Sequence, residues 1–288
     1  MSPDKSIRRR GVYLLPNLLT SAALFAGFYS VISGINGKFE PAAIASIVAG
    51  LLDGLDGRVA RLTNTQSDFG EQYDSLSDLI SFGLAPALLA FNWSLSSLSE
   101  ISTFAGKLGW LAAFLFVACA ALRLARFNTQ AGIEDKRYFQ GLASPAAAGT
   151  LVFTIWFFVD NGVAGETVRW LIFIETITLG LLMFTNVRYY SFKATPDGEK
   201  VPGVWLLLAL LVIVLLALDP PLMGMLLGCA YVVSGLIITV MGRRSWKIKR
   251  DKRLPKEAKR EPEMGSPTPT DETGSSDRHD AGSGSGHA

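Results

Sequence analysis

Apolar stretches of about 20 residues alternate with short polar connections along most of this chain. A segment of that length is what a helix needs to cross the hydrocarbon core of a bilayer, and a water-soluble core does not require it. The pattern predicts an all-α polytopic membrane protein with about eight transmembrane helices. The expected spans are residues 14–35, 41–62, 72–92, 106–126, 145–161, 168–187, 203–219 and 221–241.

The basic residues predict how these spans are oriented. With eight spans, every lysine and arginine except Lys38, Lys107 and Arg169 falls on one side of the membrane. Because Lys and Arg near span ends are retained in the cytoplasm, we expect a multi-pass protein of the cell inner (plasma) membrane with both termini cytoplasmic. The asymmetry favours contact with anionic membrane lipid over binding of nucleic acid.

Composition divides the chain into four regions. We expect a basic cytoplasmic N-terminal arm (1–10), a core of six spans (11–200), two additional C-terminal spans (201–243) and a cytoplasmic tail (244–288). The tail is charged and then rich in Gly, Ser and Pro, which predicts disorder. Both histidines, His279 and His287, lie in this tail. The sequence therefore excludes a histidine base or a histidine-ligated metal in the membrane domain.

One short stretch, "DGLDGRVARLTNTQSDFGEQYDSLSD" (residues 53–78), gathers acidic residues between two apolar segments. Two sets of its residues recur at the spacing of a helix face. The connection "LTNTQSD" is short and polar, so the two helices should fold into an antiparallel pair whose acidic stripes can face each other. The first stripe is Asp53, Asp56, Gly57, Ala60 and Arg61, and the second is Gly70, Asp74 and Asp78.

Four carboxylates in one place repel one another unless cations neutralise them. The four aspartates therefore predict a divalent-metal site. Oxygen ligands without Cys or His favour magnesium, manganese or calcium over zinc. A single Asp near a span end is more often a solvated helix-end charge, but ionisable groups inside a membrane are costly and usually functional. Gly57 and Ala60, on the same stripe, leave room for a bulky ligand.

The pattern Asp53-x2-Asp56-Gly57-x2-Ala60-Arg61-x8-Gly70-x3-Asp74-x3-Asp78 resembles the signature of the CDP-alcohol phosphotransferase family at every fixed position. The resemblance covers about residues 8 to 240 and implies that family's fold. It also implies a reaction in which a CDP-activated lipid and an alcohol give a phosphodiester and CMP. Two divalent metal ions, Mg²⁺ or Mn²⁺, are implied, bridged by Asp53 and Asp74, with Asp56 completing one and Asp78 the other. Asp78 is also implied as the general base.

The same resemblance implies which residues bind the CDP-linked substrate. Gly57, Arg61 and Ser67 match substrate-binding positions of the family. The segment "PNLLT" resembles the stretch that lies beside the nucleotide, so Asn17 and Thr20 are candidates for polar contacts. The full set of residues expected to bind CDP-diacylglycerol is Asn17, Thr20, Gly57, Ala60, Arg61, Ser67 and Gly70.

Three further stretches resemble segments of the membrane-bound phosphatidylserine synthases of bacteria and archaea. They are "ALRLARFN" (121–128), "FQGLASPAAA" (139–148, with Ala143 where proline is expected) and "NVRYYSFK" (186–193). The acceptor implied is L-serine, whose carboxylate calls for fixed cationic donors. The cations in these stretches are Arg123, Arg126, Arg188 and Lys193, and the expected serine-binding set is Arg126, Asn128, Arg188 and Lys193. The alternative is that these cations serve topology or bind lipid headgroups.

Two other functions stay open at this point. The same chemistry can use another acceptor, such as glycerol phosphate, inositol phosphate or choline, and a phosphorylated acceptor needs a denser basic pocket. A divalent-cation transporter is the alternative from another class, but transporters place such groups on broken helices of two repeated halves. Here the acids come from one helical pair. Homodimers are common in the resembling family, so a homodimer is expected on that ground.

Overall fold

In a computed structural model of the chain, residues 5–63, 65, 67–130, 138–185, 187–190 and 203–257 are described. The chain divides after Arg243 into two units, and the features discussed below lie in the first unless stated otherwise. Nearly all of the described residues are helical, as the apolar segments predict. The helices are α1 (Lys5–Ile35), α2 (Phe39–Thr63), α3 (Asp68–Asp78), η1 (Leu79–Leu84), α4 (Ala85–Trp93), η2 (Leu95–Glu100), α5 (Thr103–Gln130), α6 (Ser144–Asp160), α7 (Arg169–Phe184), α8 (Gly203–Leu218) and α9 (Pro220–Glu257).

Four helical segments of the described part are long and apolar enough to cross a membrane. They are Leu15–Ile35, Asp68–Trp93, Thr103–Thr129 and Pro220–Thr239, and α6 is apolar but shorter. Large apolar side chains such as Phe25 are exposed on the helices, which suits contact with lipid acyl chains. The chain is therefore an integral membrane protein. The prediction of eight spans is confirmed for these four and stays a prediction for the others.

Helix α9 is longer than the sequence predicts. The last span was expected to end at residue 241 and the disordered tail to begin at 244, but α9 continues to Glu257. Residues 244–257 are part of this helix, and the predicted disorder of the tail stays a prediction. Lys and Arg are good helix formers, and extending an existing helix costs far less than nucleating one. Residues 258–288 lie outside the described part, so their disorder stays a prediction.

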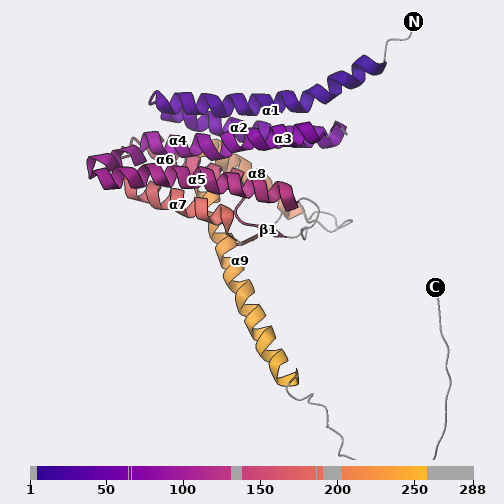
Figure 1. The fold of residues 1–288 in the computed structure, drawn as a ribbon, viewed down its shortest axis with the longest axis vertical. Helices are drawn as coiled ribbons and strands as arrows, with labels where there is room; N and C mark the ends of the chain where they lie inside the picture. Colours follow the sequence, from indigo (N-terminus) through magenta and orange to yellow (C-terminus); the bar gives the residue numbers. More distant parts are fainter. Residues whose placement is uncertain are drawn as a thin grey trace, which may run out of the picture. The chain divides into compact units, whose positions relative to one another are not determined.

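Helices α1 and α2 form the most extensive helix pair and lie side by side (Figure 1). Ala42, Ala43 and Ala49 of α2 are fully buried. Ser30 Oγ of α1 donates to the carbonyl oxygen of Ala42 at 2.8 Å and lies 2.8 Å from Ser46 Oγ. Small side chains and interhelical hydrogen bonds are typical of close helix packing in membranes. Because α1 also packs against α3, η1 and α4, it contacts both halves of the acidic stretch.

The third predicted span is one helical run that contains a π-helical segment, η1. The N–H of Ala85 donates to the carbonyl of Ile80, five residues earlier. Pro86 has no N–H and cannot make the α-helical bond to Phe82, which favours a wider turn here. Such π-segments occur frequently at functional sites. This one begins directly after Asp78.

Two short strands connect regions that are far apart in the sequence. β1 (Tyr138–Gln140) pairs antiparallel with β2 (Arg188–Tyr190). Directly after β1, Gly141 has a φ of +85°, and a side chain there would collide with the carbonyl of Met183. Ala143 caps the start of α6 with a φ of −63°, the angle that proline imposes, so the departure from the expected proline leaves the backbone unchanged.

Candidate active site

Three of the four predicted metal ligands lie together. Asp53 and Asp56 are on the C-terminal half of α2, and Asp74 is on α3. One carboxylate oxygen from each lies within 4.8 Å of the others. Helix α1 packs against both α2 and α3 and holds them on either side of this cluster. The two acidic stripes inferred from helical periodicity thus meet in space.

Asp78 is one turn beyond Asp74 and outside this group of three. Its carboxyl group interacts electrostatically with that of Asp53. The Oδ1 atoms of both Asp74 and Asp78 are buried and have no hydrogen-bond partner. Asp78 therefore adjoins the cluster and has an oxygen atom that no protein group engages.

Thr20 of α1 holds one of the clustered carboxylates. Its Oγ1 donates a hydrogen bond to Asp56 Oδ2 at 2.6 Å and also lies 3.1 Å from the carbonyl oxygen of Pro16. Both Thr20 and Asp56 are buried, each with 4% of its surface exposed. The sequence predicted Thr20 as a substrate contact. In the structure its hydroxyl orients a predicted metal ligand.

The donor set fits a hard divalent cation. Burying carboxylate oxygens without a hydrogen-bond donor or a cation is energetically unfavourable, and Asp74 carries such an oxygen. Oxygen donors without nitrogen or sulfur match the preferences of magnesium, manganese and calcium. The cluster of Asp53, Asp56 and Asp74 can therefore bind a metal ion.

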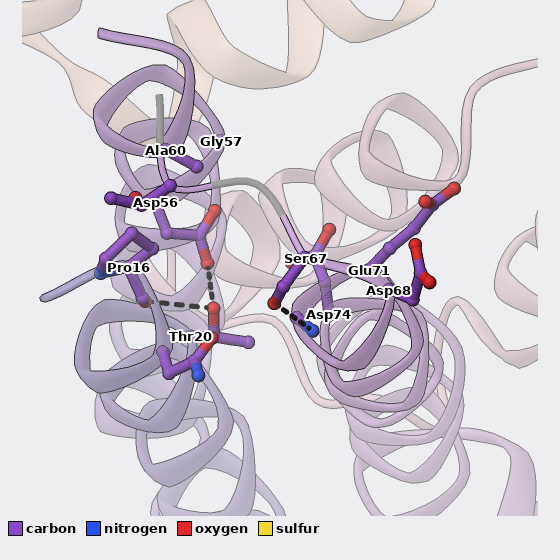
Figure 2. A pocket seen from close by; sticks show the side chains of 12 residues that line it. Pro16, Thr20, Asp56, Gly57, Ala60, Ser67, Asp68, Glu71 and Asp74 are labelled. Atoms are coloured by element: carbon purple, nitrogen blue, oxygen red, sulfur yellow. Dashed lines mark hydrogen bonds between the residues drawn. The ribbon is translucent and has the colours of Figure 1, made fainter. Parts of the chain in front are cut away.

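A cavity of about 490 Å³ opens beside the cluster. This volume is within the usual range for sites that bind small molecules. Figure 2 shows Pro16, Thr20 and Asp56 on one side of it and Ser67, Asp68, Glu71 and Asp74 on the other. The lining residues are Pro16, Asn17, Thr20, Asp56, Gly57, Ala60, Thr65, Ser67, Asp68, Gly70, Glu71 and Asp74.

Six of the seven residues expected to bind CDP-diacylglycerol line this cavity, and Arg61 does not. Arg61 is exposed, and its Nε donates to the carbonyl oxygen of Gly57 at 3.0 Å. A Cβ atom on Gly57 would have no neighbour within 4 Å, so the wall is open at this point. Ser67 accepts a hydrogen bond from the Gly70 N–H at 3.1 Å and so caps the start of α3. The roles of these residues in substrate binding stay predictions.

Four lining residues were missed in the sequence. Glu71 precedes Asp74 by three positions and Asp68 precedes Glu71 by three, so helical periodicity places them near the same face of α3 as Asp74. That signal was present in the sequence. Pro16 lies beside the predicted Asn17, whereas Thr65 belongs to the connection before α3, where no periodicity applies.

The predicted serine-binding residues are only partly described. Asn128 Nδ2 donates to Ser75 Oγ at 2.9 Å, which ties α5 to the residue after Asp74. Arg126 Nη1 donates to the carbonyl oxygen of Phe184 at 3.5 Å. The backbone of Arg188 belongs to β2, but its side chain lies outside the described part of the structure, and so does all of Lys193. Their role in binding serine stays a prediction.

Fold and site together define the class: an integral membrane protein of helices, with clustered carboxylates on the wall of a cavity. The model of the CDP-alcohol phosphatidyltransferase family matches residues 13–182. This range is more than half of the chain and contains the cluster, Asp78 and the whole cavity lining. The chain belongs to the CDP-alcohol phosphatidyltransferase family, which confirms the resemblance in its sequence.

Individual relatives share this similarity. The CDP-diacylglycerol--serine O-phosphatidyltransferase of Helicobacter pylori is 39% identical over 194 residues, which cover 66% of this chain and 77% of the relative. The protein of the same name from Methanocaldococcus jannaschii is 40% identical over 143 residues, 49% of this chain and 60% of the relative. The archaetidylserine synthase of Methanothermobacter thermautotrophicus is 35% identical over 191 residues, 66% of this chain and 74% of the relative.

Proposed function

We propose that this protein transfers the phosphatidyl group from CDP-diacylglycerol to the hydroxyl of L-serine, giving phosphatidylserine and CMP. The names of its relatives support the substrates and the acceptor. The single structural observation that carries the proposal is the clustering of metal-competent carboxylates on the wall of one cavity. That cavity is also lined by Asn17, Gly57 and Ser67, which the family resemblance associates with the CDP-linked substrate.

The cavity is proposed to receive the cytidine diphosphate part of the lipid. The open wall at Gly57 leaves room for phosphate groups close to the backbone. Arg61, one turn further along α2, is proposed to add a bidentate contact to phosphate. The acyl chains are proposed to stay in the bilayer, beside the apolar outer faces of the helices.

The aspartates are proposed to hold two divalent ions, Mg²⁺ or Mn²⁺. Asp53, Asp56, Asp74 and Asp78 would be their protein ligands. When bound, the ions supply positive charge that stabilises the diphosphate and the oxygen on which CMP departs. Thr20 keeps the Asp56 carboxylate in position through the hydrogen bond at 2.6 Å.

Asp78 is the proposed general base. Its buried Oδ1 has no hydrogen-bond partner and is available to accept the proton of the serine hydroxyl, because a positioned carboxylate can serve in this role. The serine oxygen forms a bond to the phosphorus next to the diacylglycerol. The bond from that phosphorus to the CMP oxygen breaks, and CMP leaves with the electron pair. Arg126, Asn128, Arg188 and Lys193 are the serine-binding residues proposed from the sequence.

The placement of the protein in the cell is proposed from its charge asymmetry. The basic residues favour an inner (plasma) membrane protein with both termini on the cytoplasmic side. The site would then face the cytoplasmic leaflet, where both serine and the CDP-lipid headgroup are within reach. A homodimer is proposed only on the family resemblance.

A parallel acceptor assay tests the function. Purified full-length protein in detergent receives CDP-diacylglycerol, Mn²⁺ and one of L-serine, glycerol phosphate, inositol phosphate or choline. We expect CMP release and a new phospholipid with L-serine only. Turnover of another alcohol with none for serine would overturn the acceptor assignment. Proteoliposomes without CDP-lipid are expected to show no divalent-cation flux, and a saturable flux there would favour a transporter.

A further inference from the structure

Arg123, near the C-terminal end of α5, is held among polar groups that the proposed function does not use. Its Nη1 donates to Ser144 Oγ at 3.0 Å. Ser144 is fully buried at the start of α6. The Nε of Arg123 is buried and has no hydrogen-bond partner. One edge of the guanidinium is therefore fixed by the protein, and the Nε–H is left without an acceptor.

The carboxylate of Asp78 also has a buried oxygen without a hydrogen-bond partner. Arg123 interacts electrostatically with Asp78, whose Oδ1 is also buried without a partner. Within the described part of the chain, the two groups do not form an ion pair at 4.0 Å or less. Leaving a buried polar group without a hydrogen-bond partner is energetically unfavourable. Because both atoms are buried without a partner, each is free to engage a small ligand that carries a carboxylate and a hydroxyl group.

The fold assembles this place from elements far apart in sequence. The segment η1, which begins directly after Asp78, packs against both α5 and α6. The segment that continues α3 is thereby packed against the two helices that carry Arg123 and Ser144. Tyr231 of α9 interacts electrostatically with the same guanidinium. Arg123, Ser144 and Tyr231 are not among the residues that line the cavity proposed for the nucleotide, so this place is distinct from that cavity.

We propose that Arg123 binds the carboxylate of the acceptor serine, with Ser144 holding the guanidinium in position. This assignment rests on the proposed function and names the specificity-determining contact for its acceptor. A guanidinium matches a carboxylate through two parallel N–H bonds. Serine carries its hydroxyl only a few ångströms from its carboxylate, so a serine bound to Arg123 directs the hydroxyl towards Asp78. An alcohol without a carboxylate leaves the buried guanidinium unpaired and is rejected for that reason.

Arg126, which the sequence analysis preferred, is three residues further along the same helix. Its Nη1 contacts the carbonyl of Phe184, whereas Arg123 contacts the buried Ser144 and interacts with Asp78. The sequence could not separate the two arginines because both lie in the stretch "ALRLARFN".

Kinetics of the full-length protein in detergent test the assignment, with CMP release as the signal. The variants are Arg123→Met, Arg123→Lys and, as a matched control on the same helix, Lys107→Met, which removes an exposed cation. For Arg123→Met we expect the serine KM to rise about tenfold or more, the effect of losing a charge-assisted contact. The KM for CDP-diacylglycerol should stay within about twofold by the same reasoning.

Two further measurements, the discrimination between acceptors and the binding of serine, would not change if Arg123 had only a structural role. The preference for L-serine over ethanolamine, which lacks the carboxylate, is the ratio of their kcat/KM values. Arg123→Met should lower this ratio by the same factor by which it lowers kcat/KM for serine. Thermal unfolding with CDP and Mn²⁺ present should show stabilisation by L-serine in the wild type and in Lys107→Met, but not in Arg123→Met. If Arg123→Met does not fold, Arg123→Lys provides the test. It keeps the positive charge but lacks the two parallel N–H donors of the guanidinium, so it should show smaller changes in the same direction.

The outcomes separate this assignment from the proposed function. Suppose the wild type turns over serine, while folded Arg123→Met and Arg123→Lys keep the wild-type KM for serine and the wild-type discrimination against ethanolamine. This result would overturn the role of Arg123 and leave the proposed function intact. A rise in the KM for CDP-diacylglycerol alone would likewise overturn it, by assigning Arg123 to the nucleotide lipid. If the wild type turns over no serine at all, the proposed function fails and this assignment fails with it.

Discussion

The protein places acidic side chains in its helical domain in two different ways. On α2 and α3, Asp53, Asp56 and Asp74 share one cluster beside a cavity, and Asp74 has a buried oxygen with no partner. On α7, Glu175 stands apart from that cluster, and its Oε1 accepts a hydrogen bond from Thr154 of α6 at 2.8 Å. Within the cluster Asp56 has a donor in Thr20 but Asp74 Oδ1 has none, whereas Glu175 has a donor supplied by the neighbouring helix.

This difference shows how a functional acid can be told from a structural one. The free energy cost of burying an acid can be offset by a protein donor, and Thr154 provides one for Glu175. Clustered acids without such donors are stabilised only when something else binds. The donor to Glu175 comes from a residue 21 positions away in the chain, so the sequence alone does not reveal it.

The largest expected effect comes from removing the proposed base. Asp78→Asn keeps the size of the side chain but cannot accept the serine proton. We expect turnover to fall by about 10²- to 10⁴-fold, with normal expression and a normal gel-filtration profile. CMP release with CDP-diacylglycerol and L-serine measures it. Wild-type turnover in this variant would remove Asp78 from the mechanism.

A divalent cation should stabilise the cluster but not the region of Glu175. At about 100 times its dissociation constant, a ligand that binds only the folded state adds about 2.7 kcal/mol. We expect Mn²⁺ to raise the melting temperature of the wild type and of Glu175→Gln, and not that of Asp53→Asn with Asp74→Asn. Chelation with EDTA should abolish turnover, and added Mn²⁺ should restore it. Equal stabilisation of all three proteins would contradict a metal site at the cluster.

Without divalent cations, the cluster should cost stability. Asp74→Asn removes one of the mutually repelling carboxylates, so its melting temperature in EDTA should equal or exceed that of the wild type. Thermal unfolding in detergent followed by intrinsic fluorescence measures this. A clear decrease would mean that the Asp74 carboxylate stabilises the fold through contacts with the protein itself.

Loss of the Thr20 hydrogen bond should have an intermediate effect. Thr20→Val keeps the shape of the side chain but removes the donor to Asp56. Groups that orient metal ligands typically change metal affinity or activity by about 10- to 100-fold, and we expect the lower end because Asp56 is one of several ligands. Titration with Mn²⁺ under turnover conditions gives the apparent affinity. An unchanged Mn²⁺ requirement would show that Asp56 needs no orientation by Thr20.

The smallest effect is expected at Glu175. In Glu175→Gln the side-chain oxygen still accepts the hydrogen bond from Thr154, so turnover should stay within about twofold of the wild type, as expected for a substitution that disrupts no contact. The Mn²⁺ requirement should also stay unchanged. A large loss of turnover with normal folding would erase the distinction between the two acidic regions and give Glu175 a functional role.

Helical periodicity was enough to predict the two acidic stripes, because residues at i and i+4 share a helix face whatever the tertiary context. The same rule would have added Glu71, which lines the cavity in front of Asp74. Periodicity could not predict that Thr20 bonds to Asp56, a partner 36 positions away. It also could not predict the pairing of β1 with β2, because those short strands lie in separate loops and carry no alternating pattern.

The sequence by itself determined that the chain is a helical membrane protein, that its acids gather on two helices, and to which family it belongs. These properties depend on local composition and on residues close together in the chain, where helix geometry alone relates one position to the next. The tertiary structure decided which oxygens lack partners, where the cavity opens, and that Arg123 donates to the buried Ser144. Those features arise where α1 packs against α3 and where α5 and α6 pack against η1, and the packing of distant segments is not encoded in any local spacing.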